Sequence, residues 1–113
     1  MSSGLKRIAD IEEKPHPKFP NVFIKQIAVN NETDRLSANY VRILPGAELI
    51  PHTHGVLEIF HVIKGNGSAL VNNERIEVFG GEVIIALPNT EHGLKNTGNS
   101  DIELYAVFSP GIV

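Results

Sequence analysis

Apolar and polar residues alternate over several short stretches of the chain. In residues 102–108, IELYAVF, every second side chain is apolar, which predicts a strand with one buried face. Glycine, proline and asparagine separate such stretches at short intervals, as turns require. The pattern predicts strands over residues 21–29, 36–44, 47–54, 58–64, 67–71, 75–79, 82–88, 91–96 and 102–108.

Many strands at close spacing in one short chain favour a β-sandwich or a closed barrel. The only helical candidate is a short stretch near residues 5–13, LKRIADIEE. We expect residues 1–20 to be an extended N-terminal lead-in and residues 21–113 to form a single domain. Asn72 and Asn73 predict a tight hairpin turn, because asparagine tolerates the positive φ of such turns.

Length, charge and cysteine content exclude several classes of function. The chain has 113 residues, a formal net charge of −3 and no cysteine, so it offers no thiolate ligand, disulfide or cysteine nucleophile and no basic surface for nucleic acid. The N-terminus, MSSGLKRIADIEEK, lacks the apolar core of a secretion signal. No apolar run approaches the roughly 20 residues of a membrane span. We therefore expect a cytoplasmic protein without nucleic-acid or membrane partners.

Histidines gather in residues 45–65, PGAELIPHTHGVLEIFHVIKG. His52 and His54 are two residues apart, so on a strand they point to the same face, and Glu58 follows four residues later. His92, on a later strand, is a fourth candidate. Three imidazoles and one carboxylate form a nitrogen and oxygen ligand set that suits Fe, Mn, Ni, Cu or Zn.

A pair of histidines on a strand is often only part of a solvated polar face. The neighbours of Glu58 argue against that interpretation, because Ile59 and Phe60 place it at the entrance to a core, where an unpaired carboxylate is costly. Arginine or lysine could neutralise it, but neither occurs between Arg42 and Lys64. A bound cation is therefore the favoured explanation.

Two longer spacings resemble the motifs of the cupins. The first cupin motif runs glycine, five residues, His-x-His, three or four residues, glutamate, six residues, glycine, and residues 46–65 match it without a gap. The second runs glycine, five residues, Pro-x-Gly, two residues, histidine, three residues, asparagine, and residues 81–96 match its glycine, histidine and asparagine. Leu87 and Asn89 stand where proline and glycine are usual, and asparagine tolerates the left-handed conformation of glycine.

The resemblance implies a small single-domain cupin, which is an all-β, double-stranded β-helix: a jelly-roll β-barrel with a metal inside one mouth. It implies that one divalent transition metal ion (Fe, Mn, Ni, Zn or Cu) is bound by His52, His54, Glu58 and His92. Four protein ligands would leave two neighbouring positions open, which permits dioxygenase, isomerase or lyase chemistry on a small organic molecule. The alternative is a non-catalytic module that binds or senses a small ligand. Glu58 is the one catalytic candidate, as a proton carrier that would first have to detach.

Strand alternation predicts the lining of the pocket. Arg42 and Glu103 should face outward, since charges are costly inside a small apolar barrel. The opposite faces of their strands then point inward, in a mostly apolar pocket lined by Asn39, Phe60, Leu104 and Ala106. No lysine or arginine is placed inside, which argues against a phosphorylated or multiply acidic substrate.

The remaining polar residues of interest receive structural interpretations. His61 should face outward by parity, and His16, between two prolines, should be an exposed loop residue. Asn96 is expected to serve a turn. Solvated positions are expected for Glu82 and Glu91.

The strand over residues 58–64 is apolar on both faces. Its outer side chains, Ile59 and Ile63, therefore need a cover, which the strand over residues 21–29 or a second copy of the chain would supply. Small cupins are commonly homodimers, so we expect a homodimer with residues 21–29 at or across the interface.

Overall fold

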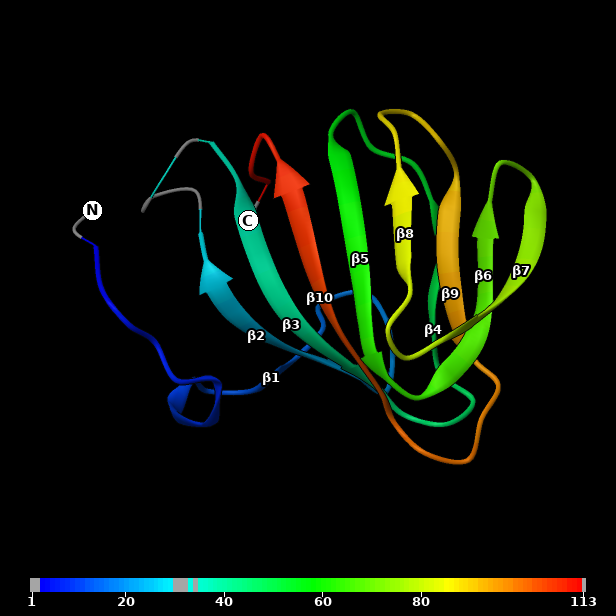
Figure 1. The fold of residues 1–113 in the computed structure, drawn as a ribbon, viewed down its shortest axis with the longest axis horizontal. Coiled ribbons are helices and arrows are strands. Elements are labelled where there is room, and N and C mark those ends of the chain that lie inside the picture. Colours follow the sequence, from blue (N-terminus) through cyan, green and yellow to red (C-terminus); the bar gives the residue numbers. More distant parts are fainter. Residues whose placement is uncertain (1–2, 30–32, 34, 113) are drawn as a thin grey trace.

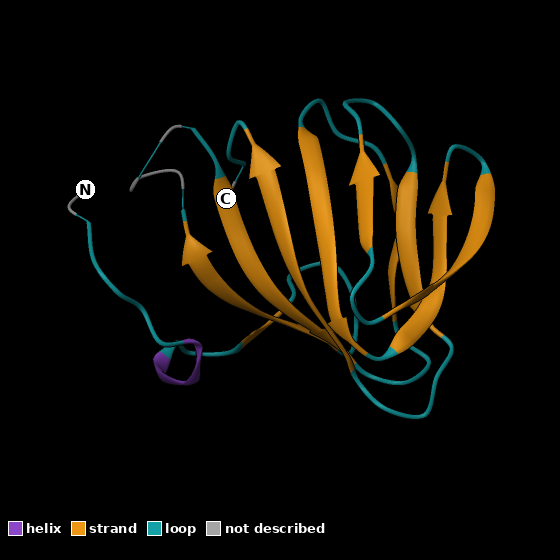
Figure 2. Cartoon of the chain, in the orientation of Figure 1, coloured by secondary structure: helices purple, strands orange, loops and turns teal. Residues whose placement is uncertain are grey.

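The computed structural model describes residues 3–29, 33 and 35–112, which form two antiparallel sheets packed face to face (Figure 1). The larger sheet has six strands in the order β1-β2-β3-β10-β5-β8, and the smaller has four in the order β4-β9-β6-β7. Strands make up most of the described chain (Figure 2). They are β1 (Lys14–Pro15), β2 (Val22–Ala28), β3 (Ser37–Ile43), β4 (Glu48–His52), β5 (Leu57–Lys64), β6 (Asn66–Val71), β7 (Glu74–Phe79), β8 (Val83–Ala86), β9 (His92–Asn96) and β10 (Ile102–Ser109).

The all-β jelly-roll fold predicted from the sequence is confirmed. The predicted helical stretch is limited to the short 3-10 helix η1 (Ile8–Asp10), and β1 is a strand that the sequence did not predict. The hairpin between β6 and β7 turns at Asn72 and Asn73, whose φ angles of 51° and 63° are positive as predicted. Asn89 also has a positive φ, of 65°, and so replaces a glycine of the cupin motif as expected.

The hydrophobic core lies between the two sheets. Alternate residues of β3 and β10, including Val41, Ile43 and Leu104, face inward and are fully buried or nearly so. Leu94 and Ala69 of the smaller sheet close the core from the other side. The period of two in the sequence therefore sets which face each strand buries.

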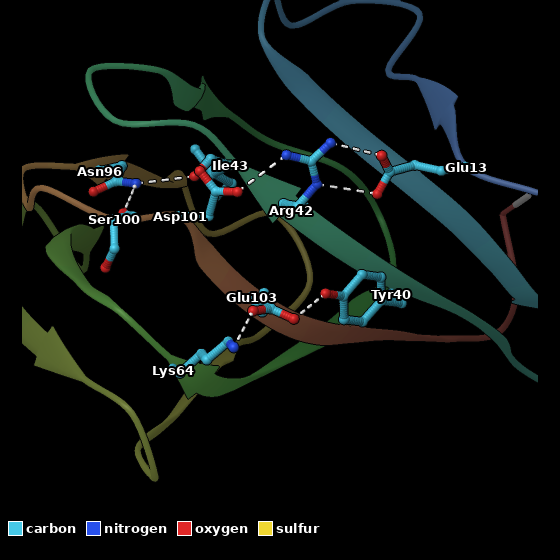
Figure 3. A network of polar contacts seen from close by, with 9 residues as sticks. All are labelled: Glu13, Tyr40, Arg42, Ile43, Lys64, Asn96, Ser100, Asp101 and Glu103. Atoms are coloured by element: carbon cyan, nitrogen blue, oxygen red, sulfur yellow. Dashed lines mark hydrogen bonds and ion pairs between the residues drawn. The ribbon is translucent and has the colours of Figure 1, made fainter. Parts of the chain in front are cut away.

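Arg42 and Glu103 alternate with the buried residues of β3 and β10, so they lie on the outer face of the larger sheet, as predicted (Figure 3). The guanidinium of Arg42 lies 2.6 Å from Glu13 and 3.0 Å from Asp101. Glu103 accepts a hydrogen bond from the hydroxyl of Tyr40, which lowers the pKa of Glu103. Because Glu13 belongs to the N-terminal lead-in, this network ties that segment to the barrel.

The prediction that residues 21–29 cover the outer face of residues 58–64 is wrong within one chain. β2 joins the same sheet as β5, with β3 and β10 between them, because strands that follow each other in sequence usually pair. The outer face of β5 and β8 therefore stays uncovered, and Ile63 and Ile85 are 40% and 56% exposed. No helix in the described ranges is long and apolar enough to cross a membrane.

Candidate metal centre

Four side chains from both sheets meet at one end of the barrel. His52 ends β4 and pairs across the smaller sheet with His92, which begins β9. Glu58 lies on β5 of the larger sheet, and His54 lies in the connection between β4 and β5. The donor atoms of these four residues all lie within 4.8 Å of one another. The structure thus brings together the four residues that the sequence suggested as candidate metal ligands.

His54 reaches the cluster by a different route from the one predicted. The sequence placed it on a strand with the parity of His52, but β4 ends at His52. The chain bends after this point, and the ring of His54 is oriented by a hydrogen bond between Nδ1 and the carbonyl of Val56, 3.0 Å away. The hydrogen bond to Val56, rather than strand parity, therefore orients the His54 ring toward the cluster.

The three imidazoles share one hydrogen-bond arrangement. In each ring Nδ1 lies against a backbone carbonyl two residues away, so this nitrogen carries the proton and, in the neutral ring, Nε2 presents its lone pair. Such bonds to the outer nitrogen are typical of metal-binding histidines, because they fix both the tautomer and the ring. The pairs are His52 with Ile50 at 2.7 Å, His54 with Val56 at 3.0 Å and His92 with Thr90 at 2.8 Å.

A cation fits between these nitrogens and the carboxylate. Oε1 of Glu58 lies 2.8 Å from Nε2 of His54 and 2.9 Å from Nε2 of His92, and the side chain of Glu58 is almost fully buried. A carboxylate oxygen cannot face two nitrogen lone pairs at these distances unless a proton or a cation lies between them. Three imidazole nitrogens and one carboxylate oxygen are ligands that divalent transition metals prefer. The donor set therefore fits such an ion.

Burial and hydrogen bonding shift the pKa values of His52 and His92 in opposite directions. Burial lowers the pKa of His52 and outweighs the opposing effect of the Ile50 carbonyl, so this ring is neutral and free to bind a metal at neutral pH. Burial also lowers the pKa of His92, but its hydrogen bonds to Glu58 and to the Thr90 carbonyl leave that pKa raised overall.

A pocket opens beside the cluster in two parts. The inner chamber, of about 60 Å³, is lined by buried residues that include Glu58, Asn39, Phe60 and Ala106. The outer vestibule, of about 400 Å³, is lined by residues nearer the surface, including Lys18. Three of the four predicted lining residues are thus in place. The fourth is not.

Leu104 does not line either part of the pocket. It points inward as strand parity predicted, but it is fully buried in the hydrophobic core. It lies two residues further along β10 than Ala106, away from the cluster. Alternation along a strand identifies the face of a residue but not its depth in the barrel.

His16 and Phe19, from the lead-in, border the pocket and were missed from the sequence. His16 was expected to be an exposed loop residue, but it is half-buried and lines both the inner chamber and the vestibule. Its Nδ1 accepts a hydrogen bond from the backbone N–H of Lys18 at 3.0 Å, and its ring stacks on Phe19 at 4.5 Å. Phe19 in turn lies 5.7 Å from the ring of His52.

The other structural interpretations hold. His61 is exposed on the outer face of β5, and Glu82 and Glu91 are also exposed. Asn96 is buried at the end of β9, where its amide donates to the carbonyls of Ile43 and Ser100 and accepts from the N–H of Gly98 (Figure 3). This confirms that Asn96 holds a turn.

Comparison with known proteins identifies the family. The family model described as the cupin domain matches residues 39–108, a range that contains all four residues of the cluster. The chain belongs to the cupin family. An RmlC-like cupin from Shewanella frigidimarina has the same fold, with a TM-score of 0.83 at 18% identity over 96% of this chain and 92% of that one.

Two of the matches to this cupin come from Thermotoga maritima. A protein named as oxalate-binding is 31% identical over 69 residues, which are 60% of this chain and 57% of the relative. The chain therefore spans little more than half the length of this curated relative. The crystal structure of a predicted oxalate decarboxylase superposes with a TM-score of 0.87 at 21% identity, over 95% of this chain and 99% of that one. At this identity the structure shows a shared fold only.

Proposed function

We propose that this cupin binds one divalent transition metal ion through His52, His54, Glu58 and His92 and holds a small carboxylic acid against it. The observation that carries the proposal is that donor atoms of three imidazoles and the buried carboxylate of Glu58 lie within 4.8 Å of one another. The Nε2 atoms of His54 and His92 lie within 2.9 Å of that carboxylate. Bound there, the ion would supply Lewis-acid polarisation of a ligand oxygen or, with Fe or Mn, redox chemistry. The expected setting is the cytoplasm, with a small molecule rather than nucleic acid or membrane as partner.

The size of the inner chamber supports a small ligand. Since one water needs roughly 10–15 Å³ of such volume, a chamber of about 60 Å³ accepts about four to six non-hydrogen atoms. Phe60 and Phe108 line this space and keep it apolar beside the cluster. Oxalate is the first candidate, because the related protein from Thermotoga maritima is named as oxalate-binding.

The cluster supports two kinds of activity. One is a metalloenzyme with dioxygenase, isomerase or lyase chemistry, in which Glu58 would carry a proton only after leaving the ion. The other is non-catalytic binding of the small ligand. The described residues that line the inner chamber offer one acid–base group beyond the cluster, His16. With this single group beyond the cluster, the lining supports binding more directly than catalysis.

Oxalate is expected to bind the metal-loaded protein and not the chelated protein. The protein should be purified without chelator, its metal determined by elemental analysis, and oxalate titrated by calorimetry before and after chelation. A ligand that binds only the native state raises stability by about 2.7 kcal/mol at 100 times its Kd. Oxalate should therefore raise the melting temperature of the metal-loaded protein and leave that of the chelated protein unchanged. Formation of formate or carbon dioxide would favour the enzyme over the binding module.

Two outcomes would contradict this proposal. One is a protein purified without chelator that carries no metal and takes up none on titration with Mn²⁺, Fe²⁺, Ni²⁺, Cu²⁺ or Zn²⁺. The other is equal affinity of oxalate for the loaded and the chelated protein.

We further propose that the cupin is a homodimer that buries the outer face of β5 and β8. Across these strands Ile59 pairs with Ile85 and His61 with Val83, so their side chains form one strip. Ile63, Val83 and Ile85 are 40%, 53% and 56% exposed. Burying one such aliphatic side chain contributes roughly 1.5–3 kcal/mol, which favours a covered strip.

Sedimentation at micromolar concentration should give twice the mass of the chain. Ile85→Lys should shift the protein to monomer, because a charge would enter the interface. Ile50→Lys is the matched control, since Ile50 is 46% exposed on β4 of the other sheet. A monomeric wild-type protein would rule out the dimer.

A further inference from the structure

We infer that Asn39 selects the ligand of this pocket, by binding the second polar group of a short bifunctional carboxylic acid whose carboxylate lies at the metal cluster. The expected class comprises hydroxy, oxo and dicarboxylic acids of two or three carbons. The inference rests on the proposed function, because it takes the cluster as the anchor of the carboxylate. It adds the group that distinguishes one small acid from another.

The side chain of Asn39 is buried without a structural partner. Its residue is 6% exposed, and its Oδ1 is the one buried side-chain nitrogen or oxygen in the described ranges that lacks a hydrogen bond. An unpaired buried polar group costs about 1–3 kcal/mol. Because Oδ1 is an acceptor, a ligand that donated a hydrogen bond to it, as a hydroxyl does, would remove this cost.

The other buried asparagine shows what a structural amide looks like in this fold. Asn96 is 1% exposed and uses both ends of its amide, as two donors and one acceptor. Its partners are the carbonyls of Ile43 and Ser100 and the N–H of Gly98. By contrast, Asn39 has a buried oxygen that the protein leaves unpaired, and its side chain borders the chamber.

The strand register places Asn39 within reach of a ligand held at Glu58. Asn39 pairs with Ala106 on β10, and Glu58 pairs with Phe108 on the other side of the same strand. Asn39 and Glu58 are therefore two strands and two residues apart, roughly 12 Å between Cα atoms at ordinary sheet spacings. Both side chains line the inner chamber, so a short ligand held at Glu58 borders Asn39 as well.

The small side chain of Ala106 leaves space in the chamber between Asn39 and Glu58. Ala106 pairs with Asn39 on one side and with Phe60 on the other. It is 3% exposed and lines the inner chamber. A larger side chain at this position would fill the space through which the two polar groups face a common ligand. Ala106 is therefore part of the ligand-binding arrangement that we infer for Asn39 and Glu58.

The chemistry of the lining defines the class of ligand. An amide offers both an acceptor and donors. The unpaired Oδ1 of Asn39 suits a ligand hydroxyl that donates to it, whereas a keto oxygen or a second carboxylate would accept from the Nδ2–H groups. No lysine or arginine lines the inner chamber, and Lys18 borders only the vestibule. A phosphorylated ligand would lack the cationic partner it requires, whereas a small acid without a second polar group would leave the amide unpaired.

The test compares two acids of equal carbon number, 3-hydroxypropionate and propionate, by calorimetry on the metal-loaded protein. In the wild type we expect a preference for the hydroxy acid, and in Asn39→Leu we expect this preference to fall about tenfold, the usual worth of one hydrogen bond to a buried group. Any preference that arises at the metal itself remains in the variant, so the difference between the two proteins isolates Asn39. Metal content should be unchanged.

Gln26→Leu is the matched control. Gln26 pairs with Asn39 from β2 but does not line the pocket, so the same replacement there should leave the preference intact. The melting temperature gives a second readout. Asn39→Leu should melt at or above the wild-type temperature, since its oxygen bonds to nothing in the fold, whereas Asn96→Leu should melt well below it.

The outcomes separate the two proposals. An unchanged preference in Asn39→Leu with metal retained would overturn the role of Asn39 and leave the proposed function standing. An unfolded or strongly destabilised Asn39→Leu would also overturn it, because the residue would then be structural. A wild-type protein that binds no metal, or neither acid, would overturn the proposed function and this inference together.

Discussion

Replacing Glu58 by glutamine is expected to abolish stoichiometric metal binding while the barrel stays folded. Glu58 provides the only carboxylate of the cluster, and its Oε1 lies within 2.9 Å of two imidazole nitrogens. Glutamine has nearly the same shape but no charge, and its amide would turn a donor or a weak acceptor toward the ion. Because even indirect partners of metal ligands contribute about 10–100-fold to affinity, the loss of this ligand should exceed about 100-fold.

Glu91→Gln is the control for this experiment. Glu91 is exposed and adjoins His92 in sequence, so its replacement changes the same charge without touching the cluster. Metal content of both variants should be determined by elemental analysis, with Zn²⁺ and Mn²⁺ titrations by calorimetry and circular dichroism as a check of folding. Full metal content in Glu58→Gln would show that Glu58 is not a ligand.

Truncation of Phe60 to alanine is expected to give the largest loss of stability. Phe60 is 1% exposed, heads the fully buried side chains by volume, and lies 5.7 Å from the ring of His92. Removing a buried phenylalanine leaves a cavity and costs about 3–5 kcal/mol. The free energy of unfolding, measured by urea denaturation, should fall by that amount, with an unchanged dependence on urea concentration.

Phe79→Ala provides the comparison, because Phe79 is 49% exposed on β7. Its truncation should cost less than about 1 kcal/mol, as surface substitutions usually do. If the two variants lost similar stability, Phe60 could not be the centre of the core that the structure describes.

The sequence predicted most of the fold because the strands alternate strictly. β3 and β10 begin and end within one residue of the predicted ranges, and their inward and outward residues are as expected. The four cluster residues could also be identified from sequence, since two fixed spacings carry them. The cost of leaving Glu58 unpaired near the core pointed to the same place.

What the sequence could not predict depends on contacts between distant segments. His16 borders the pocket because β1 pairs with β2 and its own N–H bonds to the carbonyl of Val22, 2.8 Å away; nothing in KPHPKFP indicates such pairing. Leu104 has the same inward parity as Ala106, yet only one of them lies at the depth of the chamber. β2 was expected to cover β5 but joins the same sheet, with β3 and β10 between them. Hydrophobic patterns do not encode this order of strands.

The position of β10 between β3 and β5 has a consequence for how the site assembles. The cluster lies within residues 52–92, whereas the chamber also needs Asn39 on β3 and Ala106 on β10. β3 and β5 cannot share a sheet until β10 inserts between them, and pairings so distant in sequence form late, over roughly milliseconds to seconds in small β-proteins. An ion could therefore be captured before the chamber that holds its ligand exists, and selectivity for small acids would be the last property that the folding chain acquires.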